Sequence, residues 1–264
     1  MLKRALLGLT IAALSVTAQA GTFHETVDRT FDARPGMAFS LTNVNGHITI
    51  RSWDQPRIRV HAEKTAEAFD NDAAKKGLAE LKIEMAQTGD RLNVVTHCPR
   101  NNTFNIFDFL SGQQVGLSVA YEITLPRQIN VNVDNTNGAI ELSGVSGNLK
   151  LETTNGRITA DPASGRLEAH STNGSIHARL LRVDGDRPLN IETTNGRIEI
   201  TVPPALRATL DARTTNGSVR SDLPVTVAAH SGGGRTSLQG TINGGGPELI
   251  LRTTNGSIAI KSGA

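Results

Sequence analysis

Residues 149–158 read Leu-Lys-Leu-Glu-Thr-Thr-Asn-Gly-Arg-Ile, and this stretch decides the fold of the chain. Its centre, a Thr, Ser or Asn followed by Thr-Asn-Gly and then by an aliphatic residue two positions later, occurs six times between residues 135 and 256. Successive Asn-Gly pairs of these copies lie 18, 18, 22, 21 and 39 residues apart. Such a recurrence indicates a repeat fold, in which each unit buries its apolar face against its neighbours. The long last interval holds a degenerate copy at 231–234, so we expect seven stacked units.

The apolar alternation changes phase at each Asn-Gly pair. Leu151 and Thr153 are odd-numbered, whereas Ile158 and Ala160, after the pair, are even-numbered. A strand cannot change phase in this way without a bulge or a corner. Gly supplies the positive φ that a bend needs, and Asn tolerates that region. We therefore predict a corner between two short strands of one coil at each pair. The predicted corner residues are Asn45, Gly46, Asn137, Gly138, Asn155, Gly156, Asn173, Gly174, Asn195, Gly196, Asn216, Gly217, Asn255 and Gly256.

Asn-Gly between alternating segments also predicts a type I′ hairpin, which would make successive strands antiparallel. A hairpin does not require the same dipeptide at one period with Thr-Thr before it. Coils stacked in parallel do, because they place Thr153, Ser171, Thr193 and Thr214 over one another about 4.8 Å apart, where hydroxyl and amide side chains can form ladders. We therefore predict an all-β fold, a single-stranded parallel β-solenoid with coils of about 20 residues.

The segment before the repeats predicts one further coil and a cap. Residues 39–50 repeat the phase change around Asn45-Gly46, and residues 58–62 and 115–125 alternate as strands. Asp70-Asn71-Asp72 before 73–81 is typical of a short helix with N-cap residues at its start. Stacked coils expose an apolar end that must be covered. We expect residues 21–130 to form an N-terminal coil with a capping insertion, continuous with a repeat solenoid over 131–264.

The first 20 residues have the three-part pattern of a secretory signal peptide. Lys3-Arg4 precedes an apolar run over 5–16 and then Ala18-Gln19-Ala20, which predicts cleavage after Ala20. The run is too short to cross a bilayer. We expect a periplasmic or secreted protein with no membrane span after signal removal. Losing Lys3 and Arg4 leaves 25 of the 27 Lys and Arg against 25 Asp and Glu, a balance that argues against a nucleic-acid partner.

Several motifs together resemble a known family. They are Asn45-Gly46-His47-Ile48-Thr49-Ile50 with Trp53-Asp54 after it, Leu125-Pro126, and the recurring Thr-Asn-Gly-x-Ile. This combination resembles the bacterial putative-adhesin family of β-strand-repeat domains, over residues from about 39 to 260. The resemblance implies a parallel β-solenoid. It brings no catalytic residues, because the family has none established.

The sequence offers little that suggests catalysis. A solenoid enzyme acting on polysaccharides needs paired carboxylates, and no such cluster stands out. Glu152, His170 and Glu192 should point outward in one column, where a His between two acids could hold a metal or titrate. Mixed charges of this kind are more typical of a solvated face. We predict no catalytic residue, no metal and no cofactor. Cys98, the only cysteine, is predicted to be a small buried residue, and the alternative is an intermolecular or reactive role.

Three of the seven phenylalanines, Phe104, Phe107 and Phe109, lie in a segment flanked by Asn, Gly and Gln. Exposed, they would form a surface for a partner; folded over the end of the solenoid, they would close its core. The sequence as a whole predicts a non-enzymatic extracytoplasmic scaffold or adhesin-like binding module of the bacterial cell envelope. Its partner would be an envelope protein or a glycan. The alternative is a carbohydrate-active β-solenoid enzyme.

Overall fold

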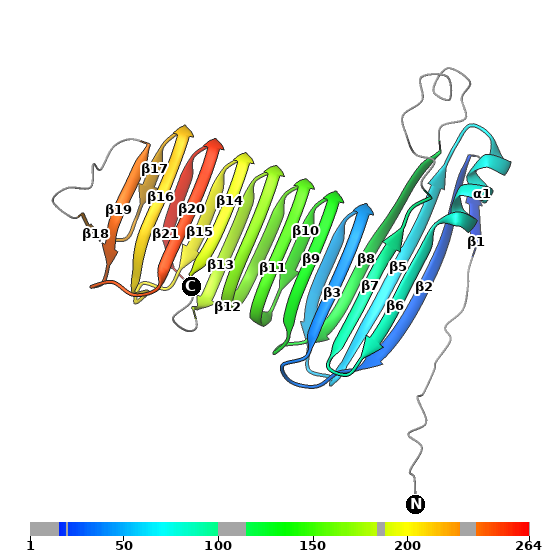
Figure 1. Ribbon diagram of the computed structural model, residues 1–264, viewed down its shortest axis with the longest axis horizontal. Helices are drawn as coiled ribbons and strands as arrows, with labels where there is room; N and C mark the ends of the chain where they lie inside the picture. Colours follow the sequence, from blue (N-terminus) through cyan, green and yellow to red (C-terminus); the bar gives the residue numbers. More distant parts are fainter. Residues whose placement is uncertain (1–15, 20, 100–114, 184–187, 228–235, 264) are drawn as a thin grey trace, which may run out of the picture.

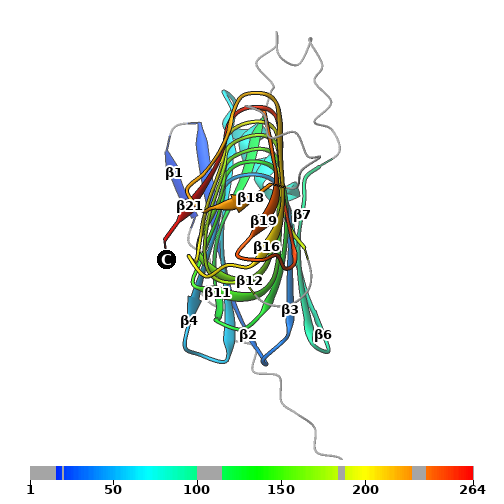
Figure 2. The ribbon, with the colours of Figure 1, turned by 90° about the vertical axis from the view of Figure 1, so that its left-hand side faces the viewer.

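The computed structural model describes residues 16–19, 21–99, 115–183, 188–227 and 236–263. Within these ranges the chain forms 21 strands and one α-helix, and all the strands belong to one sheet. The sheet folds back on itself into two faces, which lie close together when the molecule is seen end-on (Figures 1 and 2). The expected all-β fold with one short helix is confirmed.

The first face holds the strands that lead into the Asn-Gly pairs. From β7 to β16, neighbouring strands of this face run parallel. In spatial order the strands are β6 (Lys82–Thr88), β7 (Arg91–His97), β3 (Ala38–Asn45), β9 (Asn130–Asn137), β11 (Val145–Asn155), the second half of β12 (Ile158–Asn173), β14 (Leu189–Asn195), β20 (Glu248–Asn255), β16 (Ala208–Asn216), β19 (Ser237–Ile242) and β18 (Val225–Thr226).

The second face holds the strands that follow the pairs, and it is parallel from β8 to β17. In spatial order its strands are β1 (Val16–Gln19), β2 (Thr22–Asp32), β5 (Arg57–Glu67), β8 (Gly116–Pro126), β4 (Ile48–Trp53), β10 (Ile140–Ser143), the first half of β12, β13 (Ile176–Arg182), β15 (Ile198–Val202), β21 (Ile258–Ser262) and β17 (Val219–Ser221). Strand β1 falls within the expected signal segment, whose residues 1–15 and 20 lie outside the described residues.

The sheet is mixed, which differs from the prediction of a single parallel solenoid; parallel pairing is confined to the strands in the middle of the molecule. At one end β1, β2, β5 and β8 pair antiparallel, as do β6 and β7; at the other, β19 pairs antiparallel with β16 and β18. The last strand of a stack leaves its backbone groups unpaired, and a segment that turns back alongside it satisfies them. The Asn-Gly repeat in the sequence does not predict these antiparallel strands at the two ends of the stack.

The spatial order of the coils also differs from their order in the chain. Strands β20 and β21, the last in the sequence, lie between the coil β14–β15 and the coil β16–β17. Thr193 is therefore paired with Thr253, and Thr253 with Thr214, so the expected direct contact of Thr193 and Thr214 is wrong. Either order satisfies the periodicity, because every copy carries the same corner. The degenerate copy at 231–234 lies outside the described residues.

The core fills the space between the two faces. Alternate residues of each strand point inward, as in β11, where Leu149, Leu151 and Thr153 are buried. Aliphatic residues from successive coils stack on one another because the parallel register places like positions side by side. Tyr121 is the largest fully buried side chain, and its hydroxyl lies 2.7 Å from that of buried Thr96.

Helix α1 (Asn71–Glu80) packs against β2 and β5 at the end of the stack. Its N-cap residue, Asp70, accepts hydrogen bonds from the backbone nitrogens of Asp72 and Ala73, at 3.2 and 3.3 Å. Ala74 and Leu78 face the core. The helix lies where Asp70-Asn71-Asp72 predicts it.

Candidate functional site

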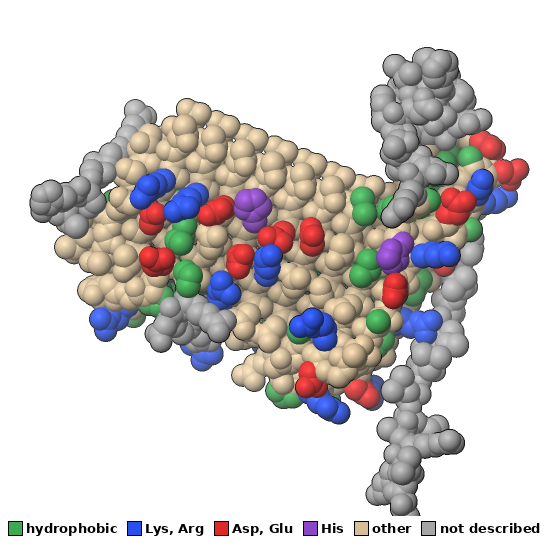
Figure 3. Space-filling model, viewed as in Figure 1, with side chains coloured by type: hydrophobic (Ala, Val, Ile, Leu, Met, Phe, Trp, Pro, Cys, Tyr) green, Lys and Arg blue, Asp and Glu red, His purple; other side chains and the backbone are tan. Residues whose placement is uncertain are grey.

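The structure places the seven Asn-Gly pairs along one edge of the stack, each between the end of one strand and the start of the next. Their side-chain amides form a continuous ladder. Each Asn donates from Nδ2 to the Oδ1 of the Asn in the preceding coil at 2.7 to 2.9 Å, in the spatial order Asn45, Asn137, Asn155, Asn173, Asn195, Asn255 and Asn216. Asn45 begins the ladder by donating to the backbone oxygen of Leu117. This edge shows a band without charged side chains in the space-filling view (Figure 3).

The glycines of these pairs are needed for a reason other than the predicted one. Only Gly46 and Gly138 have a φ in the left-handed region, at 125° and 135°. At Gly196 a Cβ would overlap the carbonyl group of Gly174 in the neighbouring coil. The same overlap with the glycine of a neighbouring coil occurs at Gly138, Gly156, Gly174, Gly217 and Gly256. The glycine is therefore required mainly because two backbones pass too close for any side chain.

A buried polar residue two positions before each Asn binds the same carbonyl. Thr193 donates from its hydroxyl to the oxygen of Gly174 at 2.8 Å, and Thr253 donates to that of Gly196 at 3.0 Å. Asn135 fills this position with its amide, which donates to Gly46 at 2.9 Å. Thr, Ser and Asn recur at this inward position because a buried carbonyl oxygen needs a donor.

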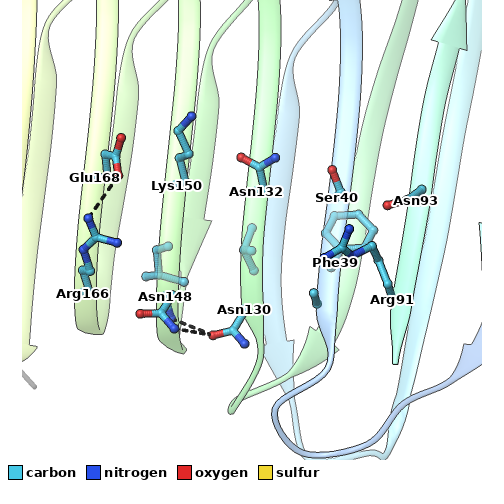
Figure 4. Close-up of a pocket in the computed structure, with 13 residues that line it drawn as sticks. Phe39, Ser40, Arg91, Asn93, Asn130, Asn132, Asn148, Lys150, Arg166 and Glu168 are labelled. Carbon is cyan, nitrogen blue, oxygen red and sulfur yellow. Dashed lines mark hydrogen bonds and ion pairs between the residues drawn. The ribbon is translucent and has the colours of Figure 1, made fainter. Parts of the chain in front are cut away.

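A groove of about 350 Å³ lies on the first face, across β7, β3, β9, β11 and β12 (Figure 4). One row of outward side chains crosses it at the spacing of neighbouring strands, because Ser40 is paired with Asn93 on one side and with Asn132 on the other. Lys150 and Glu168 continue the row. The polar residues of the lining are Ser40, Arg91, Asn93, Asn130, Asn132, Asn148, Lys150, Arg166 and Glu168.

Four of these side chains have no protein partner within the part of the chain that the structure describes. They are Ser40, Arg91, Asn93 and Asn132, and Figure 4 draws them together at one end of the groove. The amide of Asn148, in contrast, donates to Asn130 at 3.0 Å. Unpaired hydroxyl and amide groups on adjacent strands can donate to and accept from the hydroxyl groups of a ligand.

The charges at the other end of the groove largely neutralise one another. Lys150 lies 2.9 Å from Glu152, and this hydrogen bond raises the pKa of the lysine ammonium. Arg166 lies 3.4 Å from Glu168 and also donates to the backbone oxygen of Pro188 at 3.3 Å. The groove therefore offers hydrogen-bonding groups with little free charge apart from Arg91.

Comparison with known proteins identifies the family. The profile of the Toastrack DUF4097 family matches residues 127–261, which is more than half of the chain. The chain belongs to this Toastrack family. The matched residues run from the turn before β9 to β21 and include six of the seven Asn-Gly corners.

Solved structures resemble this Toastrack chain at low identity. A structure described as a "putative cell adhesion protein" from Clostridium sporogenes shares 12% identity, with 90% of this chain and 100% of that one covered and a TM-score of 0.49. A "putative adhesin" from Bacteroides fragilis shares 13% identity over 90% and 96%, with a TM-score of 0.36. A "putative lipid binding protein" from Parabacteroides distasonis shares 6% over 90% and 97%, at 0.27. No curated protein matches the chain.

The predicted aromatic site and the predicted charge column have different outcomes in this Toastrack chain. Phe104, Phe107 and Phe109 lie outside the described residues. The column is described: His170 lies between Glu152 and Glu192 in the register, with its Nδ1 3.9 Å from Glu192. Arg252 lies 3.9 Å from Glu192 on the other side, so the column mixes signs along the stack, as Figure 3 also shows.

The described ranges also bear on metal, thiol and membrane sites. No group of three or more His, Cys, Asp or Glu residues there could hold a metal ion. Cys98 is a half-buried free thiol whose pKa is raised by burial. No helix among the described residues is long and apolar enough to span a membrane.

A second groove, of about 630 Å³, runs along the edge opposite the Asn-Gly corners. Trp53, Pro56, Pro126, Pro162 and Leu181 contribute to its lining. Two of its polar side chains are engaged by neighbours: the Trp53 indole donates to the backbone oxygen of Arg57 at 2.7 Å. Arg127 donates to Asp54, also at 2.7 Å. The groove on the first face is the stronger candidate site because its polar side chains without a partner among the described residues form one row across adjacent strands.

The groove on the first face was not predicted from the sequence. The signal was present, since Ser40, Asn93 and Asn132 are all polar residues at outward positions of alternating strands. What the sequence lacked was the pairing of β7, β3 and β9, which brings together residues up to 92 positions apart.

Proposed function

We propose that this chain is a non-enzymatic, extracytoplasmic binding module of the bacterial cell envelope, and that its ligand is a neutral, hydroxyl-rich glycan held in the groove on the first face. The observation that carries the proposal is the row Asn93, Ser40 and Asn132, three polar side chains on adjacent strands that have no partner among the described residues. Amide and hydroxyl groups both donate and accept, which suits sugar hydroxyls.

The shape and charge of the groove favour an extended, uncharged ligand. The row runs along the stack, so a polymer that repeats along its length could make the same contact on successive strands. Each such hydrogen bond contributes about 0.5–1.5 kcal/mol, so several together are needed for measurable affinity. Lys150 pairs with Glu152 and Arg166 pairs with Glu168, which leaves little free positive charge to attract an acidic polymer.

The stack serves this function as a rigid platform. In our proposal the parallel coils between β8 and β17 behave as a short solenoid, which the Asn ladder and the core hold in register. The proposed location rests on the signal-peptide pattern of residues 1–20. N-terminal sequencing of the exported protein tests it: we expect Gly21 as the first residue, and an unprocessed chain would contradict it.

Affinity electrophoresis in gels containing dextran, mannan or polygalacturonate tests the binding proposal. We expect retardation by a neutral polymer, little by polygalacturonate, and only a weak effect of salt. The triple variant Ser40→Ala/Asn93→Ala/Asn132→Ala should lose about tenfold in affinity, equivalent to about 1.4 kcal/mol. The control Thr154→Ala/Thr194→Ala alters two exposed corner threonines away from the groove and should bind like the wild type.

Two results would contradict the proposal. One is equal retardation of the wild type and the triple variant by every polymer, or no retardation of either. The other is the release of reducing sugar by the purified protein, which would support the carbohydrate-active enzyme. Circular dichroism of each variant ensures that a loss of binding is not a loss of fold.

A further inference from the structure

Eight Asn-Gly pairs occur in the chain, and those at Asn216 and Asn255 sit in identical pentapeptides. Residues 214–218 and 253–257 both read Thr-Thr-Asn-Gly-Ser. Local sequence therefore assigns Asn216 and Asn255 the same chemical reactivity. Their places in the stack differ, because Asn255 has a coil on both sides and Asn216 ends the ladder.

We propose that Asn216 is a site of spontaneous deamidation in the folded protein, while the other six corner asparagines are protected. In this reaction the backbone nitrogen of Gly217 loses its proton to base and attacks Cγ of Asn216. The new N–Cγ bond closes a five-membered succinimide, the Cγ–Nδ2 bond breaks, and ammonia leaves with the proton. Water then opens the ring at either carbonyl and yields aspartate or isoaspartate.

In six of the seven corners the attacking nitrogen is already engaged in a hydrogen bond to the neighbouring coil. The nitrogen of each Gly donates to the backbone oxygen of the Asn in the next coil at 2.8 to 3.0 Å, as Gly196 does to Asn255 and Gly256 to Asn216. In addition, the Oδ1 of each of these asparagines accepts from the next Asn of the ladder. Ring closure would break both bonds in the interior of a regular array, which requires local opening of the stack.

Neither of these two hydrogen bonds is formed at the Asn216 corner within the described residues. Gly217 donates no backbone hydrogen bond to any described residue, and the Oδ1 of Asn216 accepts none from them. Both residues are exposed. A single bond, from Nδ2 of Asn216 to Oδ1 of Asn255 at 2.8 Å, holds the side chain. Ring closure at Asn216 therefore breaks only this one hydrogen bond, which lies at the end of the ladder.

The eighth pair, Asn243-Gly244, lies outside the ladder. Its side-chain nitrogen donates to two backbone oxygens, those of Pro204 at 2.9 Å and Leu206 at 2.8 Å. Rotation of this amide toward Gly244 breaks two hydrogen bonds to the main chain. We therefore expect Asn243 to react more slowly than Asn216.

Mass spectrometry of the intact native protein after incubation in mildly alkaline buffer tests the proposal. Trypsin separates the matched pair into peptides 214–220 and 253–261, because Arg213, Arg220, Arg252 and Lys261 flank them. Digestion is kept short and slightly acidic. We expect conversion at Asn216 to be at least about tenfold faster than at Asn255 or any other corner. In urea the rates at the two identical pentapeptides should converge.

The variant Asn216→Thr separates protection by the backbone hydrogen bond from protection by the side-chain ladder. Asn216→Thr removes the side-chain donor to Asn255 but keeps the backbone oxygen that binds the nitrogen of Gly256. Asn255 should stay slow in this variant. Equal native rates at Asn216 and Asn255, faster conversion at Asn243, or a tenfold acceleration of Asn255 in Asn216→Thr would each overturn the proposal.

Discussion

Gly196→Ala is expected to lower the free energy of unfolding by about 3 kcal/mol or more. The added methyl group would overlap the carbonyl group of Gly174, and the nitrogen of residue 175 also lies 2.9 Å from the Cβ position. Both neighbours belong to the backbone of a packed coil, so neither can move without shifting the coil. The Gly196–Asn255 and Gly174–Asn195 backbone hydrogen bonds lie at the same point. Urea unfolding followed by circular dichroism measures the loss.

Gly116→Ala is the matched control. Gly116 is an exposed strand residue whose added Cβ would meet only ordinary contacts, at 3.7 and 3.9 Å from Glu67, and its φ is outside the left-handed region. We expect a change within about 0.5 kcal/mol. Equal losses in the two variants would mean that close backbone approach is not what requires glycine at the corners.

The protein is expected to lose stability as the pH rises from 10 to about 12, because of Tyr121. Burial raises the pKa of this phenol from 10.0 to about 12, although its hydrogen bond with Thr96 acts in the opposite direction. Below pH 10 the phenol is neutral in the folded and the unfolded chain. Between the two values only the unfolded chain releases its proton, so the contribution of on the order of 3 kcal/mol disappears over this interval.

Tyr121 is the only tyrosine, so ultraviolet absorbance follows its ionisation without interference. We expect phenolate to appear together with unfolding or near pH 12. The variant Tyr121→Phe should lack this absorbance change and the associated part of the pH dependence. It should also be less stable at neutral pH by about 1–3 kcal/mol, because the buried Thr96 hydroxyl loses its partner. Ionisation of Tyr121 at pH 10 in the folded protein would contradict its burial.

The sequence contained enough to predict the corners and the inward residues. The change of phase between Thr153 and Ile158 depends only on local alternation, which the structure retains. The reason for the glycines was misjudged, because close approach of Gly174 and Gly196 depends on the neighbouring coil and not on the local backbone. Local propensity indicates where a chain bends but not what passes beside it.

The order of the coils and the groove could not be predicted in the same way. Strand β20 fits between β14 and β16 because all three present the same corner and the same inward residues, so the repeat pattern does not distinguish the alternatives. The groove needs β7 beside β3, although the helix and three strands intervene between them in the chain. Both features depend on long-range pairing.

The order and register of the coils are most directly tested by disulfide cross-linking in a Cys98→Ser background. Thr194, Thr254 and Thr215 are exposed and occupy the same position in β14, β20 and β16. Neighbouring strands lie about 4.8 Å apart, within reach of a disulfide, whereas strands two apart are beyond the limit of about 7 Å. Mild oxidation should therefore cross-link Thr194→Cys/Thr254→Cys readily and leave Thr194→Cys/Thr215→Cys reduced. Efficient cross-linking of the second pair and not the first would show that the coils follow chain order, and would contradict the stack described above.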